Sequence, residues 1–291
     1  MANNIALNKK YVTMLDEVYK NASLTAKLDG NPDLVQQGAN ANELIIPMIE
    51  MQGLGDYDRN SGYVSGDVTM TNETVKCNFD RGRMFTVDTM DNEETAGLAF
   101  GRLASEFIRT KVVPELDAFR FASYCGKSGI TKKEETLNDG AAVLAALRVA
   151  TTAMDEAEVP MEDRHLFITP TLDGMIADLD TTKSREILSR FATKTLVPQT
   201  RFYTAIDQKS GKGGEETGGF AKAAVGGAEL NFMVIHKPAL IQFEKHVAPK
   251  IVTPEQNQDA DAYKYGYRNV GIADVYKNKL AGVYASHKTV G

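Results

Sequence analysis

The feature that most constrains the fold of this chain is the stretch from Arg81 to Gly126, which predicts a short strand followed by one very long helix. Asp91 and Glu94 have the D-x-x-E spacing of a capping box, in which each side chain accepts a hydrogen bond from the other residue's backbone N–H. Gly126 is placed to end the helix in the left-handed conformation that glycine adopts easily. A helix from Asn92 to Tyr124 would be roughly 50 Å long. A helix of this length crosses a domain or runs along a flattened one.

Pro114 interrupts the predicted helix. Proline removes a backbone donor, which costs about 3 kcal/mol in a helix interior, so we expect a kink between Lys111 and Val113, or two collinear helices. Apolar residues recur at spacings of three and four and mark a buried stripe. They are Ala96, Ala99, Leu103, Phe107, Leu116, Phe119 and Ala122. The charged residues fall largely elsewhere, on a face that is either solvated and carries surface ion pairs or meets neighbouring subunits. They are Arg102, Glu106, Arg109, Glu115, Asp117 and Arg120.

The composition is that of an ordinary globular protein and excludes some functions. The chain has 291 residues, enough for one large core or two smaller ones. Its 33 basic and 39 acidic side chains give a net charge of −6. This charge argues against a nucleic-acid binder with a basic surface, but it is compatible with a protein that encloses nucleic acid without gripping it. Cys77 and Cys125 are isolated, which favours buried thiols in a reducing compartment. No signal peptide or membrane-spanning stretch is recognisable in the sequence, so we expect synthesis in the cytosol.

Residues 63–80 predict a β-hairpin. Apolar residues alternate on both sides of a polar stretch, Thr71 to Glu73, which we interpret as the turn. The alternating residues are Val68, Met70, Val75, Cys77 and Phe79. A two-stranded hairpin is marginally stable alone, so its apolar side needs cover from its own core or from a neighbouring chain. An earlier apolar run, Leu44 to Ile49, contains Pro47, which restricts that strand to an edge or an irregular position.

The rest of the chain mixes helices and strands. Asn138-Asp139 opens a helix that runs to Glu158, and Pro170 stands where the first residue of another helix belongs. We expect helices at 140–158, 172–179 and 184–191, strands at 164–169, 229–236, 239–244, 248–252 and 263–267, and a β-like segment at 270–285. The sequence around the strand at 164–169 therefore forms an α/β unit.

No motif predicts a catalytic, metal or cofactor site. Residues 207–219, DQKSGKGGEETGG, lack the G-x-x-x-x-G-K-[ST] pattern and the strand–helix context of a phosphate-binding loop, so we expect a mobile surface loop. Asp259 and Asp261 lack the other positions of a calcium loop. The histidines are scattered, no G-x-S-x-G motif is present, and no cysteine has a catalytic context.

Two sets of residues have competing interpretations. Arg81 and Arg83 flank Gly82 just after the predicted hairpin. They form either a bend with two solvated arginines or pairs with carboxylates of neighbouring subunits, since arginine is favoured at interfaces. Three tyrosines alternate along a later strand with few basic residues beside them, so we favour core or cross-strand packing over base stacking. They are Tyr263, Tyr265 and Tyr267.

In its order of segments, the chain resembles the major capsid protein of tailed bacteriophages (Caudovirales type). The matching segments are DRGRMFTVDTMDNEE at 80–94, VVPELDAFRFA at 112–122, RHLFITP at 164–170 and the tail from Tyr267 to Tyr284. The resemblance covers nearly the whole chain and rests on the order of these segments. It implies an α+β fold of the Hong Kong 97 type. The implied parts are an N-arm at 1–33, an E-loop hairpin with peripheral-domain strands at 34–90, the spine helix of the peripheral domain at 91–137, an axial domain at 138–245 that contains the loop at 207–219, and return strands at 246–291.

The resemblance also implies a structural function and no enzymatic activity or cofactor. The subunit would assemble with copies of itself into the pentamers and hexamers of an icosahedral head, made in the host cytoplasm and present in the virion. Its partners would be a separate scaffolding protein, a portal and packaged double-stranded DNA bound without sequence specificity, with no membrane. No lysine–asparagine pair here matches the crosslink of some relatives. The residues that we expect at the assembly interface are Val68, Met70, Val75, Phe79, Arg81, Arg83, Glu93, Arg102 and Arg109.

Two alternatives remain at this stage. The same fold type serves encapsulin-like nanocompartments, whose shell encloses an enzyme cargo. The other alternative is an unrecognised cytosolic α/β enzyme with its site on the loops after the strand that ends near Ile168, which would need a pocket with convergent polar groups. If the hairpin is an inter-subunit loop, deleting Gly62 to Asp80 is expected to leave a folded monomer that cannot assemble. If it packs in its own core, the deletion is expected to give insoluble protein.

Overall fold

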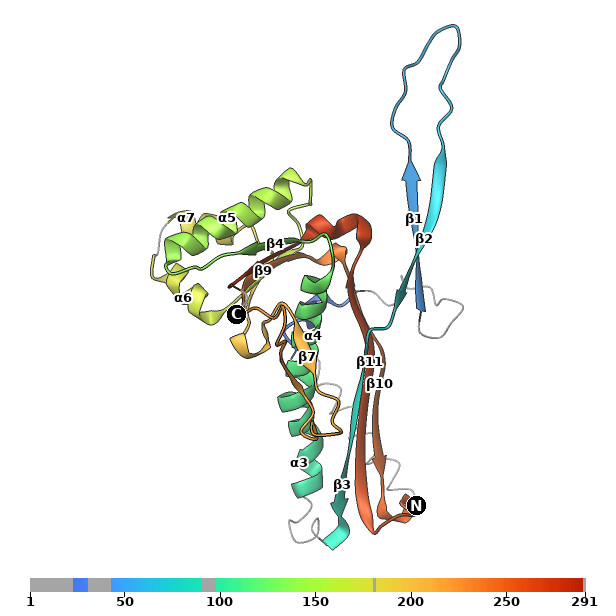
Figure 1. Cartoon of the computed structure of the whole chain (residues 1–291), viewed down its shortest axis with the longest axis vertical. Helices are drawn as coiled ribbons and strands as arrows, with labels where there is room; N and C mark the ends of the chain where they lie inside the picture. The colour runs from blue at the N-terminus through green and yellow to red at the C-terminus, as the bar shows by residue number, and fades with distance from the viewer. Residues whose placement is uncertain (1–22, 31–42, 91–97, 180–181, 290–291) are drawn as a thin grey trace.

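A long helix and a three-stranded sheet run side by side along the length of the protein (Figure 1). The structure, a computed structural model, describes residues 23–30, 43–90, 98–179 and 182–289. The helix consists of α3 (Leu98–Phe107), the π-helical turn η3 (Ile108–Val112) and α4 (Val113–Gly126). The sheet is antiparallel in the order β10 (Leu240–Val252), β11 (Ala262–Val275) and β3 (Phe79–Asp88). Together with the projecting strands β1 and β2, these elements give the protein its elongated shape (Figure 1).

The predicted interruption before Pro114 is confirmed, and it takes the form of a π-helical turn inside a continuous helix. The N–H of Val113 bonds the carbonyl of Ile108, five residues back. Pro114 then lies in the first turn of α4, where the missing N–H of proline is tolerated. The widened turn thus removes the conflict between the proline and the preceding carbonyls.

The helix ends at the predicted residue, but the predicted cause, a left-handed conformation of Gly126, is wrong. Gly126 is the last residue of α4 and does not have a positive φ. The helix ends because Lys127 adopts an extended conformation, with φ −64° and ψ 127°. The predicted capping box of Asp91 and Glu94 lies outside the described residues.

Aromatic side chains fill the space between the helix and the three-stranded sheet. Tyr265 and Tyr267 of β11 are buried there, as the packing interpretation of the tyrosines predicted. Phe107 of α3 makes edge-on contacts with Phe85 of β3 and with Tyr267, at centroid distances of 4.7 and 6.2 Å. The other buried members of this core are Phe79, Ala104, Ile108, Val113 and Leu116. Alternation along β11 and the three-to-four spacing of the helix therefore converge on one apolar layer.

A five-stranded mixed sheet forms the second part of the fold. Its order is β4 (Thr131–Glu134), β12 (Val283–His287), β9 (Leu230–His236), β5 (Arg164–Ile168) and β6 (Thr193–Leu196). The helices α5 (Gly140–Glu156), α6 (Pro170–Ala177) and α7 (Thr182–Leu188) pack with this sheet (Figure 1). The Asp139 carboxylate caps α5 by accepting from the N–H of Ala142 at 2.7 Å, and Pro170 begins α6, so both predicted helix starts are confirmed. Both edge strands are short and carry lysines, which discourages pairing with another chain.

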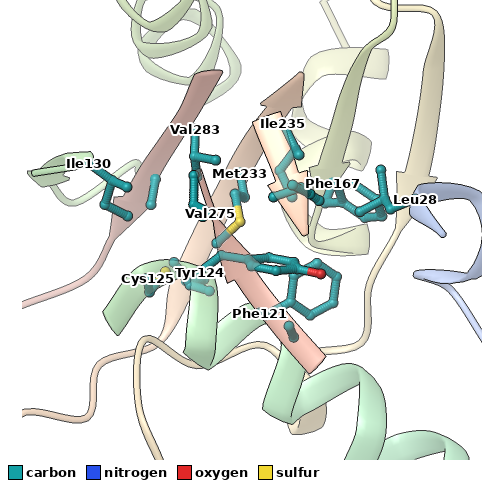
Figure 2. Packing of buried hydrophobic residues seen from close by; sticks show 14 of the residues in the cluster. Leu28, Phe121, Tyr124, Cys125, Ile130, Phe167, Met233, Ile235, Val275 and Val283 are labelled. Atoms are coloured by element: carbon teal, nitrogen blue, oxygen red, sulfur yellow. The ribbon is translucent and has the colours of Figure 1, made fainter. Parts of the chain in front are cut away.

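The C-terminal half of α4 joins this sheet through a second apolar core (Figure 2). Phe121 makes edge-on contacts with Phe167 of β5 and Phe202, at 5.2 and 4.9 Å between ring centroids. Cys125 is buried in the same core, and burial raises the pKa of its thiol to about 12, whereas Cys77 is half-buried. The prediction of a buried thiol is therefore confirmed for Cys125 alone.

The hairpin is built from different residues than predicted. β1 (Glu43–Met51) pairs with β2 (Val68–Lys76) along the full length of both strands, and residues 52–67 connect them. The stretch Thr71 to Glu73, predicted as the turn, lies in the middle of β2, where Asn72 pairs with Pro47. Polar residue types misled the prediction, because a strand with little cover tolerates them as readily as a turn does. The edge position predicted for Pro47 is confirmed, since both strands of a two-stranded sheet are edges.

Short elements complete the described chain. β7 (Ile206–Gln208) and β8 (Phe220–Lys222) form a second, small hairpin. The short 3₁₀ helices are η1 (Ala26–Leu28), η4 (Gln199–Arg201), η5 (Lys237–Ala239), η6 (Pro254–Gln256) and η7 (Lys277–Gly282).

A buried polar cluster on α4 fixes the segment 23–30 to the protein. The Asp117 carboxylate, which is fully buried, accepts from the Ser23 hydroxyl at 2.8 Å and from the Thr25 hydroxyl at 2.7 Å. It also accepts from the backbone N–H groups of Leu24 and Thr25 and from the Arg201 guanidinium. Five donors to one carboxylate offset the cost of burying its charge.

Arg120, one turn further along α4, extends the cluster to the three-stranded sheet. Its guanidinium donates to the Thr25 hydroxyl at 2.8 Å and to Glu244 of β10 at 3.0 Å, and it is 2% exposed. Both interpretations of the helix charges, solvation and contact with neighbouring subunits, are therefore wrong for Asp117 and Arg120. They hold residues of an expected N-arm inside the subunit's own core, where Leu28 is also buried.

We predict that Asp117→Ala lowers the free energy of unfolding by about 3–5 kcal/mol, because it leaves Arg201 and the 23–30 segment without their shared acceptor. Glu106→Ala is the control, since Glu106 is exposed and its carboxylate pairs with the exposed Arg109 in the next turn. It should cost less than about 1 kcal/mol. Urea unfolding of the two variants measures both values, and equal losses would contradict the role assigned to Asp117.

Candidate assembly interface

The β1–β2 hairpin projects beyond the rest of the protein and is here called the arm, residues 43–76 (Figure 1). Its two strands pair with each other and with no further strand among the described residues. In β2, the five residues from Val68 to Asn72 are all exposed, whereas Glu73 and Val75 are buried. The arm thus has a buried root and an uncovered outer half.

The outer half of the arm has one apolar face. Ile49 lies opposite Met70 and Met51 lies opposite Val68, and directly opposed residues point to the same side of a sheet. These four side chains are 60%, 67%, 74% and 68% exposed in that order. On the other side of the outer half of the arm, Glu50 pairs with Thr69, and both residues are polar. The arm therefore presents one apolar side, which the described residues of the chain leave exposed.

The connecting loop continues this apolar surface. Leu54, Tyr57, Tyr63 and Val64 are all exposed, and the rings of Tyr57 and Tyr63 contact each other at 4.9 Å between centroids. Soluble monomers rarely leave such contiguous apolar groups in water. Among the described residues, more than half of the large exposed hydrophobic side chains belong to the arm.

The residues predicted for the interface divide into three groups. Val68 and Met70 lie on the exposed apolar face of the arm. Val75 and Phe79 are 6% and 4% exposed and pack in the subunit's own core, so the prediction that they meet a neighbour is corrected. Their alternation with Val68 and Met70 suggested one continuous face, but Val75 is an odd number of residues from both and points to the opposite side of the strand.

The charged residues predicted for the interface lie in different environments. Arg109 is exposed and pairs with Glu106 at 2.8 Å, as the surface ion-pair interpretation predicted. Arg102 lies in α3, but its side chain is outside the described part of the structure, as is all of Glu93.

Arg81 and Arg83 bind residues of their own chain. The Arg81 guanidinium donates to the Glu115 carboxylate at 2.7 Å and to the carbonyls of Lys209 and Gly219. Arg83 donates to the carbonyl of Glu216 at 2.7 Å. Both arginines lie in the regular strand β3, so the interpretation as a solvated bend is wrong, and the carboxylate that Arg81 reaches is in the same subunit.

The glycine-rich loop, residues 207–219, binds both of these arginines through its backbone carbonyls. Its own carboxylates bind its own backbone, since Glu215 accepts from the N–H of Ser210 at 2.7 Å and Glu216 from that of Gly214 at 2.9 Å. These hydrogen bonds lower the pKa of both carboxyl groups. The loop lies against β3 of the three-stranded sheet, not against the five-stranded sheet. Sequence analysis expected a mobile surface loop, and in the structure this loop makes defined hydrogen bonds with β3 and within itself.

Sequence analysis missed Ile49, Met51 and the apolar residues of the connecting loop. A usable signal was present, because Ile49 and Met51 alternate around Glu50 in the same way as Val68 and Met70 alternate around Thr69. The predicted turn at Thr71 to Glu73 hid this match by pairing β2 with the wrong partner strand.

Within the described residues, no group of three or more His, Cys, Asp or Glu side chains is arranged to hold a metal ion. No described helix is long and apolar enough to cross a membrane.

The fold is similar to that of several solved viral structures. A structure from Gordonia phage Cozz has a TM-score of 0.60 and 11% identity, covering 92% of this chain and 87% of the other. A virus-like particle from Pyrococcus furiosus has a TM-score of 0.59 and 9% identity, covering 96% and 98%. The capsid of the cyanophage P-SCSP1u has a TM-score of 0.57 and 11% identity, covering 88% and 86%. No protein-family model matches the chain, and no curated protein matches it in sequence.

These similarities cover nearly the whole length of both partners, so the chain has the α+β fold of phage capsid proteins, the Hong Kong 97 type expected from the resemblance. At about 10% identity, the shared property is the fold.

We predict that Gly218→Ala releases the glycine-rich loop from β3. A Cβ atom at Gly218 would lie 2.8 Å from the Arg83 guanidinium, so the arginine must move, and we expect this movement to weaken its bond to the Glu216 carbonyl. Gly213→Ala is a matched control, because Gly213 has the same φ of +61° but nothing within 4 Å of its Cβ position. Amide exchange in residues 206–222 should be about fivefold faster in Gly218→Ala than in Gly213→Ala, as for a loss of about 1 kcal/mol. Equal rates in the two variants would show that Arg83 does not hold the loop.

Proposed function

We propose that this chain is the major capsid protein of a tailed bacteriophage and that it assembles with copies of itself into the head. The observation that carries the proposal is the arm, whose apolar face is left exposed by the described residues, on a fold that phage capsids share. A second copy of the chain is the expected cover, because a shell needs every subunit to meet identical neighbours.

Covering the arm supplies a substantial driving force. Fully burying one Val, Ile or Met side chain contributes about 1.5–3 kcal/mol. The four residues Ile49, Met51, Val68 and Met70 thus represent several kcal/mol for each subunit, and the loop residues add to this. Since a two-stranded sheet is marginal on its own, contact with a neighbour also stabilises the arm itself.

The finer features follow the same proposal. Pentamers and hexamers would form the icosahedral shell, with a scaffolding protein and a portal as further partners. The net charge of −6 suits a wall that encloses double-stranded DNA without binding its sequence. Assembly would take place in the host cytoplasm, and the protein would then remain in the virion.

The two alternative functions are less well supported. Phage capsids among the similar structures favour a head over an enzyme-filled nanocompartment. The structural neighbours also point away from an enzyme, since they are shells and viral particles.

We predict that Met70→Asp abolishes shell formation while the subunit stays folded, because burying an unpaired carboxylate in an apolar contact costs several kcal/mol. Thr71→Asp is the control, since Thr71 is the next residue of β2, is also exposed and points to the opposite side of the arm. Electron microscopy and sedimentation of purified protein, assembled at high concentration, should show shells or rings for the parent chain and for Thr71→Asp. Shells formed equally well by Met70→Asp would contradict the proposed contact.

We also predict that the arm can be removed only above its root. The deletion of Gly62 to Asp80 would remove Val75 and Phe79 from the core and should therefore unfold the subunit, contrary to the outcome expected for an inter-subunit loop. Replacing residues 48–71 by Asn-Gly joins Pro47 to Asn72, which are directly paired and suit a two-residue turn. Circular dichroism should show a folded protein, and electron microscopy should show no shells. Normal shells from this variant would mean that the arm is not an assembly element.

A further inference from the structure

Among the described residues, few contacts hold the buried root of the arm to the rest of the protein, which is here called the body. Val75 packs against Ile241 and Ile272 of the three-stranded sheet. Asn78 lies between β2 and β3. Its side-chain amide donates to the Ala273 carbonyl at 2.8 Å and accepts from the Ala273 N–H at 3.0 Å. These contacts fix the end of β2, but Val75 and Asn78 both follow Glu73 in the chain and lie against the body, not where the arm becomes exposed.

Glu73 is the last buried residue of β2 before the arm becomes fully exposed. Its side chain is 3% exposed, and its Oε1 atom lies 4.0 Å from the Lys127 ammonium and 3.7 Å from the Lys277 ammonium. Lys127 is the residue that ends α4, and it also binds Asp274 of β11 at 2.8 Å. Lys277 opens η7. One carboxylate therefore connects the arm to the end of the long helix, to the sheet and to the segment before β12.

We propose that Glu73 is a positioning residue that sets the direction of the arm. The two lysines approach its carboxylate from different elements, so a change in the direction of the arm would lengthen at least one of these two contacts. The functional consequence rests on the proposed capsid role, because the apolar face of the arm meets a neighbour only when the arm leaves the body at a defined angle.

Small changes at the root are amplified along the arm. Val68 lies five residues beyond Glu73, about 17 Å along the strand. A change of about 10° in the direction of the arm at Glu73 would move Val68 by about 3 Å, comparable with the rise of one residue along a strand. A displacement of this size is enough to shift which side chains face the neighbouring subunit.

The chemistry of Glu73 favours a role in setting the direction of the arm over a role in stabilising the protein. Packing alone could hold an apolar residue at position 73 next to Val75, and replacing a buried ion pair by a hydrophobic residue is often neutral or stabilising. The Oε2 atom of Glu73 has no hydrogen-bond partner among the described residues, so the carboxylate is not fully compensated. We therefore assign this buried charge to the direction of the arm and not to the stability of the protein.

The test measures the direction of the arm in the unassembled chain. Spin labels on cysteines introduced at Asn60 in the arm loop and at Arg148 on α5, in a Cys77→Ser background, report the distance between arm and body. The distance distribution is compared between the parent chain, Glu73→Gln, Glu73→Met and Lys127→Met, at concentrations below assembly. Glu50→Gln is the control, because Glu50 is an exposed acid of the same arm that lies beyond its root.

We expect a clearly broader or shifted distribution for the two Glu73 variants and for Lys127→Met, with no change for Glu50→Gln. The thermal midpoint of Glu73→Met should equal or exceed that of the parent, which separates a positioning role from a stabilising one. An unchanged distribution in both Glu73 variants would overturn the proposal. Because the labels are read before assembly, failure of the parent chain to form shells would count against the proposed capsid function and would leave the distance result intact.

Discussion

The constraint on which the rest of the structure depends is that α4 must serve two cores and a polar cluster at once. Its first turns, with Val113 and Leu116, pack on the three-stranded sheet, and its last turns, with Phe121 and Tyr124, pack on the five-stranded sheet. The charged residues between them bind the segment 23–30. Most residues of α4 are thereby buried, and the described elements leave the outer half of the arm exposed.

Local signals in the sequence predicted most elements, because their causes lie within a few residues. The cap at Asp139, the proline that starts α6 and the interruption before Pro114 are all of this kind. The failures have distant causes. Asp117 and Arg120 were assigned to an outer face because their partners, such as Thr25 and Glu244, are about a hundred residues away in the chain. The same holds for Arg81, whose partners are Glu115 of α4 and two carbonyls of the glycine-rich loop.

The candidate interface was half predictable for the same reason. The exposed apolar pair Val68 and Met70 follows from alternation in β2, but the side of the sheet to which each residue belongs depends on its partner strand. Once β1 is the partner, Ile49 and Met51 complete the apolar face, while Val75 turns into the core. The two parts of the arm therefore differ. Its root packs in the core of its own chain, and its outer half presents an apolar face that is suited to a neighbour.

The central claim is that the apolar face of the arm is covered by another copy of this chain. A photo-crosslinking amino acid at position 49 tests it directly, in particles assembled from an equal mixture of ¹⁴N- and ¹⁵N-labelled protein. Mass spectrometry of the crosslinked peptides should find mixed pairs, in which one peptide carries ¹⁴N and the other ¹⁵N, at the frequency of random mixing. Crosslinks only between peptides of the same isotope would show that the arm folds back on its own subunit and would contradict the account.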